Sequence, residues 1–92
     1  MKLAGAIVTV KGEVQGVGFR WWALKRAHLR GVTGWVRNNR DGSVTALAEG
    51  ERGALDAFID DLREGPSLAV VRAVDIDWQE YTGTYAGFDI TH

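Results

Sequence analysis

The sequence predicts an α+β sandwich, in which two helices cover one face of a mainly antiparallel sheet of four to five strands. The first observation is the order of strand-like and helix-like segments, β-α-β-β-α-β. The second is the length of 92 residues, which suits a single domain over 1–92. The third is the composition, 46% hydrophobic and 25% charged, which is typical of a folded globular chain.

The first strand and the first helix are predicted from apolar alternation and helix propensity. Within residues 6–14, Val8, Val10 and Val14 share one face and polar residues take the other, as in a half-buried strand. Residues 20–30, "RWWALKRAHLR", contain good helix formers and no glycine or proline. The glycine that follows predicts the end of this helix.

A hairpin is predicted next. Residues 33–38, "TGWVRN", and residues 43–49, "SVTALAE", are both typical of short strands. Between them Asp41-Gly42 is a strong turn signal. We expect Gly50 to end the second of these strands.

The remaining segments complete the sandwich. Residues 51–63 place apolar side chains at spacings of three and four, which predicts an amphipathic helix closed by Gly65-Pro66. Residues 70–78 alternate as a strand with one polar face, and a short strand is expected at 88–90. Two split strand–helix–strand units of this kind form the ferredoxin-like sandwich, which hosts many unrelated functions.

Composition excludes several classes of site. The chain has no cysteine, so disulfides, thiolate nucleophiles and cysteine metal sites are absent, which fits a cytoplasmic protein. The net charge of −1 gives no field that would attract a nucleic acid or a membrane surface. The apolar run near the N-terminus reaches Lys11 too soon for a membrane span, and we expect no signal peptide.

The stretch "GEVQGVGFR", residues 12–20, lies between the first strand and the first helix. Its glycines match neither the dinucleotide fingerprint nor the P-loop. Glycines still allow consecutive N–H groups to face one concavity, and the helix start and the Arg20 guanidinium add positive charge there. This pattern indicates an oxyanion site. The alternative is a tight connection with Arg20 paired to a surface acid, and for the loop alone that alternative is preferred.

Asn38 ends its predicted strand on the same face as Val36, whereas Asn39 falls in the turn. A side-chain amide both donates and accepts hydrogen bonds, as is needed to hold a water molecule. The alternative is that Asn38 only forms the turn, and for this residue alone that alternative is again preferred.

Taken together, "GEVQGVGFR" and "GWVRNNRDGSV" closely resemble the acylphosphatase family. The resemblance continues through "GPS" at 65–67 to Phe88-Asp89-Ile90 and covers almost the whole chain in order. The two motifs together are far more specific than either one. One departure is Arg30, which stands before the glycine that ends the first helix, where the family commonly has an apolar residue.

The resemblance implies an enzyme that hydrolyses the carboxyl–phosphate bond of acyl phosphates to a carboxylate and inorganic phosphate. It implies that Arg20 binds the phosphate and that Asn38 orients the attacking water. It also implies that backbone N–H groups of the preceding loop bind the phosphate, from Gln15, Gly16, Val17, Gly18 and Phe19. No metal, cofactor or covalent intermediate is expected, and the protein is expected to be a monomer.

The residue inventory agrees with such a reaction. The only serines are Ser43 and Ser67, and neither His28 nor His92 has a partner typical of a catalytic or metal site. The acidic pairs Asp60-Asp61 and Asp75/Asp77 are typical of solvated faces. An activated anhydride needs mainly alignment and charge stabilisation, and an oxygen of its own phosphate could accept the proton of the water.

Two other classes of protein share the predicted fold. RNA-recognition motifs share the order of elements, but they need aromatic residues on the strand that here reads "SVTALAE". Acylphosphatase-like domains also occur in larger carbamoyl-transferring maturation proteins, although 92 residues leave no room for the further domains. Carbamoyl phosphate could still be a substrate.

The sequence also bears on where the tryptophans lie and on how the acyl group is bound. Trp21, Trp22, Trp35 and Trp78 are interpreted as core and helix–sheet packing, because aromatic residues dominate small cores. Trp35 has the opposite parity to Val36 and could therefore line the open face of the sheet. No segment forms an obvious acyl pocket, so broad acyl specificity is expected.

Overall fold

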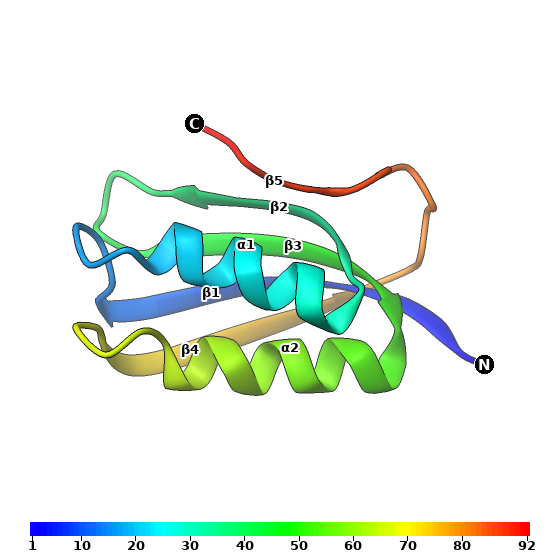
Figure 1. Ribbon diagram of the computed structural model, residues 1–92, viewed down its shortest axis with the longest axis horizontal. Helices are drawn as coiled ribbons and strands as arrows, with labels where there is room; N and C mark the ends of the chain where they lie inside the picture. Colours follow the sequence, from blue (N-terminus) through cyan, green and yellow to red (C-terminus); the bar gives the residue numbers. More distant parts are fainter.

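The computed structural model describes residues 1–92 and has five strands and two helices (Figure 1). In chain order these are β1 (Leu3–Glu13), α1 (Phe19–Arg30), β2 (Thr33–Asn38), β3 (Val44–Glu51), α2 (Arg52–Glu64), β4 (Val70–Gln79) and β5 (Phe88–Ile90). Neither helix is long and apolar enough to cross a membrane.

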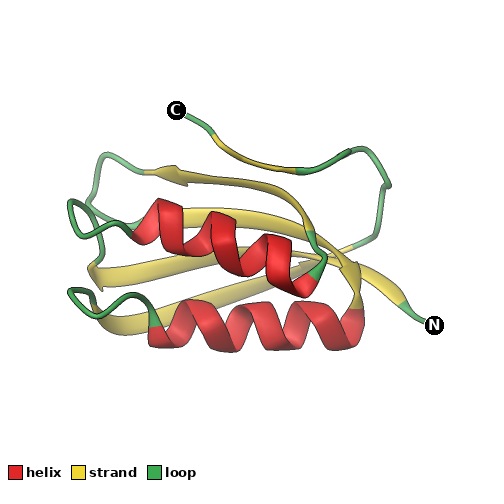
Figure 2. Ribbon diagram, viewed as in Figure 1, coloured by secondary structure: helices red, strands yellow, loops and turns green.

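The strands form one sheet in the order β4-β1-β3-β2-β5. All neighbouring strands are antiparallel except β2 and β5, which run parallel. Both helices lie on the same face of the sheet and leave the other face open (Figure 2). The predicted ferredoxin-like sandwich is therefore confirmed.

The predicted boundaries are close to those observed. Residues 33–38 are strand as predicted, and the first helix begins one residue earlier, at Phe19. The prediction that Gly50 ends a strand is wrong. Gly50 pairs with Ala4, and β3 continues one residue further, because the early start of β1 provides it with a partner.

The core lies between the helices and the covered face of the sheet. The face of β1 that carries Val8 and Val10 is fully buried, and so is the apolar stripe of α2. This stripe is the predicted set, Leu55, Phe58, Ile59 and Leu62. The ring of Phe58 packs edge-on against Phe88 with centroids 5.6 Å apart, which ties β5 to α2.

The two helices are joined by a buried carboxylate, which contradicts the interpretation of Asp60-Asp61 as a solvated pair. Asp61 faces α1 and accepts hydrogen bonds from Arg30 Nε at 2.8 Å and from Arg26 Nη2 at 3.1 Å. Asp60 is exposed, as expected. The Arg30 departure from the family pattern thus supplies one of the two ion pairs of Asp61.

These contacts shift the pKa values of Asp61 and Arg30. Burial by itself raises the pKa of Asp61, but hydrogen bonds from Arg30 and Arg26 outweigh it and hold the pKa below the ordinary value of 3.8. The hydrogen bond that Arg30 donates to Asp61 in turn raises the pKa of Arg30. The pair is therefore charged at neutral pH.

None of the four tryptophans belongs to the buried core, so the interpretation of these residues as core packing is wrong. Trp22, for example, is only half-buried and donates from Nε1 to the carbonyl oxygen of Asp61 at 3.0 Å. The core is filled instead by valine, alanine, leucine and phenylalanine, which leaves the indoles at its margin.

The two ends of the sandwich differ. The β1–α1 loop, the β2–β3 turn and the α2–β4 loop meet at one end, and the β4–β5 connection crosses the opposite end (Figure 1). There the buried carboxylate of Glu49 accepts hydrogen bonds from the N–H groups of Thr82 and Gly83 and from the Thr82 hydroxyl. Glu49 therefore anchors the connection that leads to β5.

We predict that Asp61→Asn lowers the free energy of unfolding by about 2 kcal/mol or more at pH 7, because two arginines lose their counterion. The lowered pKa of Asp61 makes its stabilisation present above pH 3.8 and lost as pH falls below that value. Urea unfolding at pH 7 and pH 3 should show the deficit shrinking in acid. Asp60→Asn is the matched control, since its carboxylate is 80% exposed and lies 4.0 Å from Arg63. A deficit independent of pH would contradict this account.

Candidate active site

The loop between β1 and α1 has a backbone that requires glycine. Gly16 and Gly18 have φ of 74° and 80°, in the left-handed region that disfavours other residues. A Cβ at either position would meet nothing within 4 Å. The glycines are therefore needed for the dihedral angle, and the space beside them is open to a ligand.

The N–H groups of this loop have no partners within the protein. Residues 15–18 donate no backbone hydrogen bond, and the first bond of the helix runs from Trp22 N to Gly18 O at 3.0 Å. No side chain caps the helix and its first turn has no acid. The positive end of α1 is thus left unoccupied, which is the arrangement that binds anions at helix starts.

Arg20 is likewise without a partner. It makes no ion pair and no hydrogen bond, whereas five of the other seven arginines pair with acids, as Arg72 does with Glu13 at 2.8 Å. The alternative that Arg20 pairs with a surface acid is therefore contradicted. A half-buried guanidinium without a counterion is suited to binding an anion bidentately.

Asn38 is the last residue of β2 and is paired in the ladder with Val44. Its side-chain amide makes no hydrogen bond within the protein, so both its donor and its acceptor are available. The alternative that Asn38 forms the turn is contradicted, because neighbouring residues form the turn.

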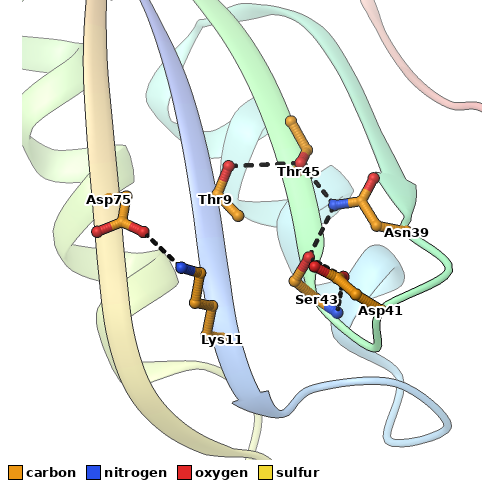
Figure 3. Close-up of polar contacts among 7 residues, drawn as sticks. All are labelled: Thr9, Lys11, Asn39, Asp41, Ser43, Thr45 and Asp75. Carbon is orange, nitrogen blue, oxygen red and sulfur yellow. Dashed lines mark hydrogen bonds and ion pairs between the residues drawn. The ribbon is translucent and has the colours of Figure 1, made fainter.

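The turn is held by Asn39 and Asp41 (Figure 3). Asn39 Nδ2 donates to the hydroxyl oxygens of Ser43 at 2.9 Å and Thr45 at 2.7 Å. Asp41 accepts from both the N–H and the hydroxyl of Ser43, and these hydrogen bonds lower the pKa of Asp41. The turn is therefore rigid without using Asn38.

Gln15 connects the loop to this turn. Its side-chain Nε2 donates to the carbonyl oxygens of Asn39 at 2.7 Å and Ser43 at 2.9 Å. These two hydrogen bonds fix the distance between the loop that precedes α1 and the end of β2. The sequence predicted only a backbone role for Gln15, and no local pattern reveals the partners of its side chain.

One cavity of about 240 Å³ joins these features. It is lined by residues of the loop, the helix start and the end of β2: Val14, Gly16, Gly18, Phe19, Arg20, Trp21 and Asn38. Arg20 and Asn38, expected together from the sequence, both line it. Gln15 and Val17, whose backbone N–H groups were expected to bind the phosphate, do not line it. Val14 and Trp21 line it without having been expected.

The chemistry available in the cavity is limited. Arg20 is the one titratable side chain among the lining residues, which include no hydroxyl, thiol, imidazole or carboxylate. The cavity can therefore bind an oxyanion and orient a neutral molecule. No group of three or more histidine, aspartate or glutamate side chains lies together as a candidate metal site.

The open face of the sheet does not resemble an RNA-binding surface. Its central row consists of Trp35, Leu47 and Ile7 on adjacent strands, and Trp35 lies there as its parity predicts. The guanidinium of Arg37 covers the Trp35 ring at 4.9 Å. Asp77 extends the row on β4 with negative charge, and Trp35 is the one aromatic residue in the row, so the row lacks the stacked aromatics that RNA binding needs.

Comparisons with known proteins agree on one family. The family model described as acylphosphatase matches residues 6–90. The acylphosphatase of Roseiflexus sp. (strain RS-1) is 48% identical over 90 residues, which are 98% of this chain and 97% of that protein. The crystal structure of acylphosphatase from Bacillus subtilis has a TM-score of 0.93 at 33% identity, covering 99% of this chain and 100% of that one.

A larger protein also matches. The crystal structure of full-length HypF in its phosphate- and nucleotide-bound form has a TM-score of 0.90 at 32% identity. The match covers 99% of this chain and only 12% of HypF. The chain is thus similar to whole acylphosphatases and to a small part of HypF.

We predict that Gln15→Ala weakens binding of inorganic phosphate about tenfold, because the loop loses both hydrogen bonds to the turn and its N–H groups no longer keep their positions. The free energy of unfolding should fall by only about 1 kcal/mol. Calorimetric titration and urea unfolding measure the two effects. Gln79→Ala is the matched control, since this glutamine is exposed on β4 and makes no side-chain hydrogen bond. Unchanged phosphate affinity in Gln15→Ala would show that the loop holds its shape without this connection.

Proposed function

The chain belongs to the acylphosphatase family, and on that basis we propose that it hydrolyses acyl phosphates by attack of water inside the cavity that Arg20 and Asn38 line. Acylphosphatase activity itself follows from the family and from relatives that match along their full length.

The phosphate group binds to Arg20 and to the loop before α1. The guanidinium presents a planar fork to two phosphate oxygens, and the N–H groups of residues 15–19 and the positive end of the helix dipole surround the third. Both sets of donors lack partners in the protein, which supports this assignment. The same donors stabilise the charge that develops on the phosphoryl oxygens during transfer.

Asn38 holds the attacking water. Its carbonyl oxygen accepts a hydrogen bond from the water, and its amide N–H₂ can donate to a phosphate oxygen or to the water oxygen. The fixed end of β2, against a turn that Gln15 connects to the loop, keeps this amide in a constant position relative to Arg20. Such alignment lowers the entropic part of the barrier.

The reaction needs no nucleophile from the protein. The water oxygen bonds to phosphorus as the bond from phosphorus to the bridging oxygen breaks, and the carboxylate leaves with that electron pair. The water proton passes to a non-bridging oxygen of the same phosphoryl group, because no side chain that lines the cavity can serve as a base. The products are a carboxylate and inorganic phosphate.

A single observation carries this assignment: Arg20 and Asn38 line one cavity, and neither side chain has a hydrogen-bond or ion-pair partner in the protein. The direct test is hydrolysis of benzoyl phosphate by folded, chelator-treated protein without added metal. Catalysed release of phosphate is expected. No rate above the uncatalysed one would refute the proposal.

The residues proposed to carry out the reaction, Arg20, Asn38 and the loop before α1, lie close together around one cavity. We propose that residues 1–92 act as a single domain and as a monomer, in the cytoplasm. A specific activity that stays constant over a hundredfold range of protein concentration is expected, and a loss on dilution would contradict it.

We predict that Arg20→Ala lowers kcat/KM at least about a hundredfold and abolishes measurable inhibition by inorganic phosphate. Arg20→Lys should recover little, because an ammonium group lacks the bidentate fork. Arg37→Ala is the matched control: it removes the same charge from β2, outside the cavity, and should change kcat/KM by no more than about twofold. Equal losses in the two alanine variants would mean that Arg20 acts only through general electrostatic attraction.

We predict that Asn38→Ala separates binding from turnover. The inhibition constant of inorganic phosphate should stay within about twofold of that of the unmodified protein, whereas kcat should fall about a hundredfold or more because the water loses its orientation. Steady-state kinetics with phosphate as inhibitor measure both quantities on one protein. Near-normal kcat in this variant would show that Asn38 does not hold the water.

A further inference from the structure

Trp21 differs from the other tryptophans. Trp22, Trp35 and Trp78 each lie against an arginine, with guanidinium-to-centroid distances of 5.3, 4.9 and 3.7 Å. Trp21 has no cation–π partner, no aromatic partner and no hydrogen bond from its indole N–H, and it is 63% exposed. A single exposed apolar residue is common on protein surfaces, so exposure alone means little.

The exposure of Trp21 is informative because of where the residue lies. The residue follows Arg20 in the first turn of α1 and lines the same cavity as Arg20 and Asn38. It is the most exposed of the three hydrophobic residues in that lining, because Val14 and Phe19 are both buried in the core. An indole ring without a packing partner therefore lies at the margin of a cavity whose polar groups suit a phosphate.

An acyl phosphate has two parts, and the proposed function accounts for only one. The phosphoryl group occupies the loop and Arg20, and the acyl group must extend from the bridging oxygen toward the opening of the cavity. The one large apolar surface there is the indole of Trp21. Flat apolar groups pack well on an indole face, whereas a methyl or amino group covers little of it.

We propose that Trp21 is the acyl-binding residue and that it gives the enzyme a preference for acyl phosphates with aromatic acyl groups over acetyl and carbamoyl phosphate. This inference rests on the proposed function and replaces the expected broad acyl specificity by a graded one. The acyl carbon chain does not change during the reaction, so the contact binds substrate and transition state equally. It therefore lowers KM and leaves kcat unchanged.

The test compares benzoyl phosphate with acetyl phosphate in the unmodified enzyme and in Trp21→Ala, Trp21→Phe and Leu29→Ala. In Trp21→Ala the KM for benzoyl phosphate should rise about three- to tenfold with kcat within about twofold, and the KM for acetyl phosphate should not change. Trp21→Phe should recover part of the difference. Leu29→Ala removes a 65% exposed side chain of the same helix outside the cavity and should change neither KM.

Two binding measurements make the test independent of turnover. The inhibition constant of inorganic phosphate should be the same in Trp21→Ala as in the unmodified enzyme. The inhibition constant of phenacylphosphonate, in which a methylene group replaces the bridging oxygen, should rise by the same factor as the KM for benzoyl phosphate. Together these results would place the contact on the acyl side of the substrate.

The outcomes separate this inference from the proposed function. If the unmodified enzyme hydrolyses both substrates and Trp21→Ala shifts their KM values equally or not at all, the acyl-binding role is overturned and the proposed function stands. A weaker affinity for inorganic phosphate in Trp21→Ala would also overturn it, because the indole would then support the phosphate site. If the unmodified enzyme hydrolyses neither substrate, the proposed function fails first.

Discussion

The pair of hydrogen bonds from Gln15 to the β2–β3 turn is the constraint on which the arrangement of the cavity depends. One side of the cavity belongs to the loop before α1, and the other belongs to the end of β2, a separate element. The side-chain amide of Gln15 joins the two at 2.7 and 2.9 Å. Since a reaction that depends on alignment is sensitive to displacements of a fraction of an ångström, we expect the bridge to matter more for catalysis than for stability.

Polar groups at the cavity differ from those elsewhere in whether they have hydrogen-bond or ion-pair partners in the protein. Away from the cavity the two buried carboxylates have partners: Asp61 pairs with two arginines of α1, and Glu49 accepts hydrogen bonds from the β4–β5 connection. At the cavity, Arg20, Asn38 and the loop N–H groups are left without partners. These donors are exposed or half-buried, and no protein group competes for them, so they remain available to an anionic ligand.

The sequence predicted those parts of the structure that depend on local pattern. The spacing of apolar residues predicted the strand at 33–38 and the amphipathic stripe of α2, and the Asp41-Gly42 pair predicted the turn. Family motifs brought Arg20 and Asn38 together before any geometry was known. What the sequence did not predict depends on contacts between distant segments. The acceptors of Gln15 are backbone carbonyls, and Asp61 is buried only because α2 packs on α1. Trp21 stands out only because the other three tryptophans each lie against an arginine.

The anchoring of the β4–β5 connection by Glu49 also has a consequence for association between molecules. Without β5, strand β2 would be an edge of the sheet and would present a row of free N–H and C=O groups to any other extended chain. The three residues of β5 pair with Gly34, Trp35 and Val36, and Thr91 N adds a bond to Val36 O. By holding the β4–β5 connection, which crosses the far end of the sandwich (Figure 1), Glu49 thus helps to keep the strand that carries Asn38 from becoming a template for aggregation.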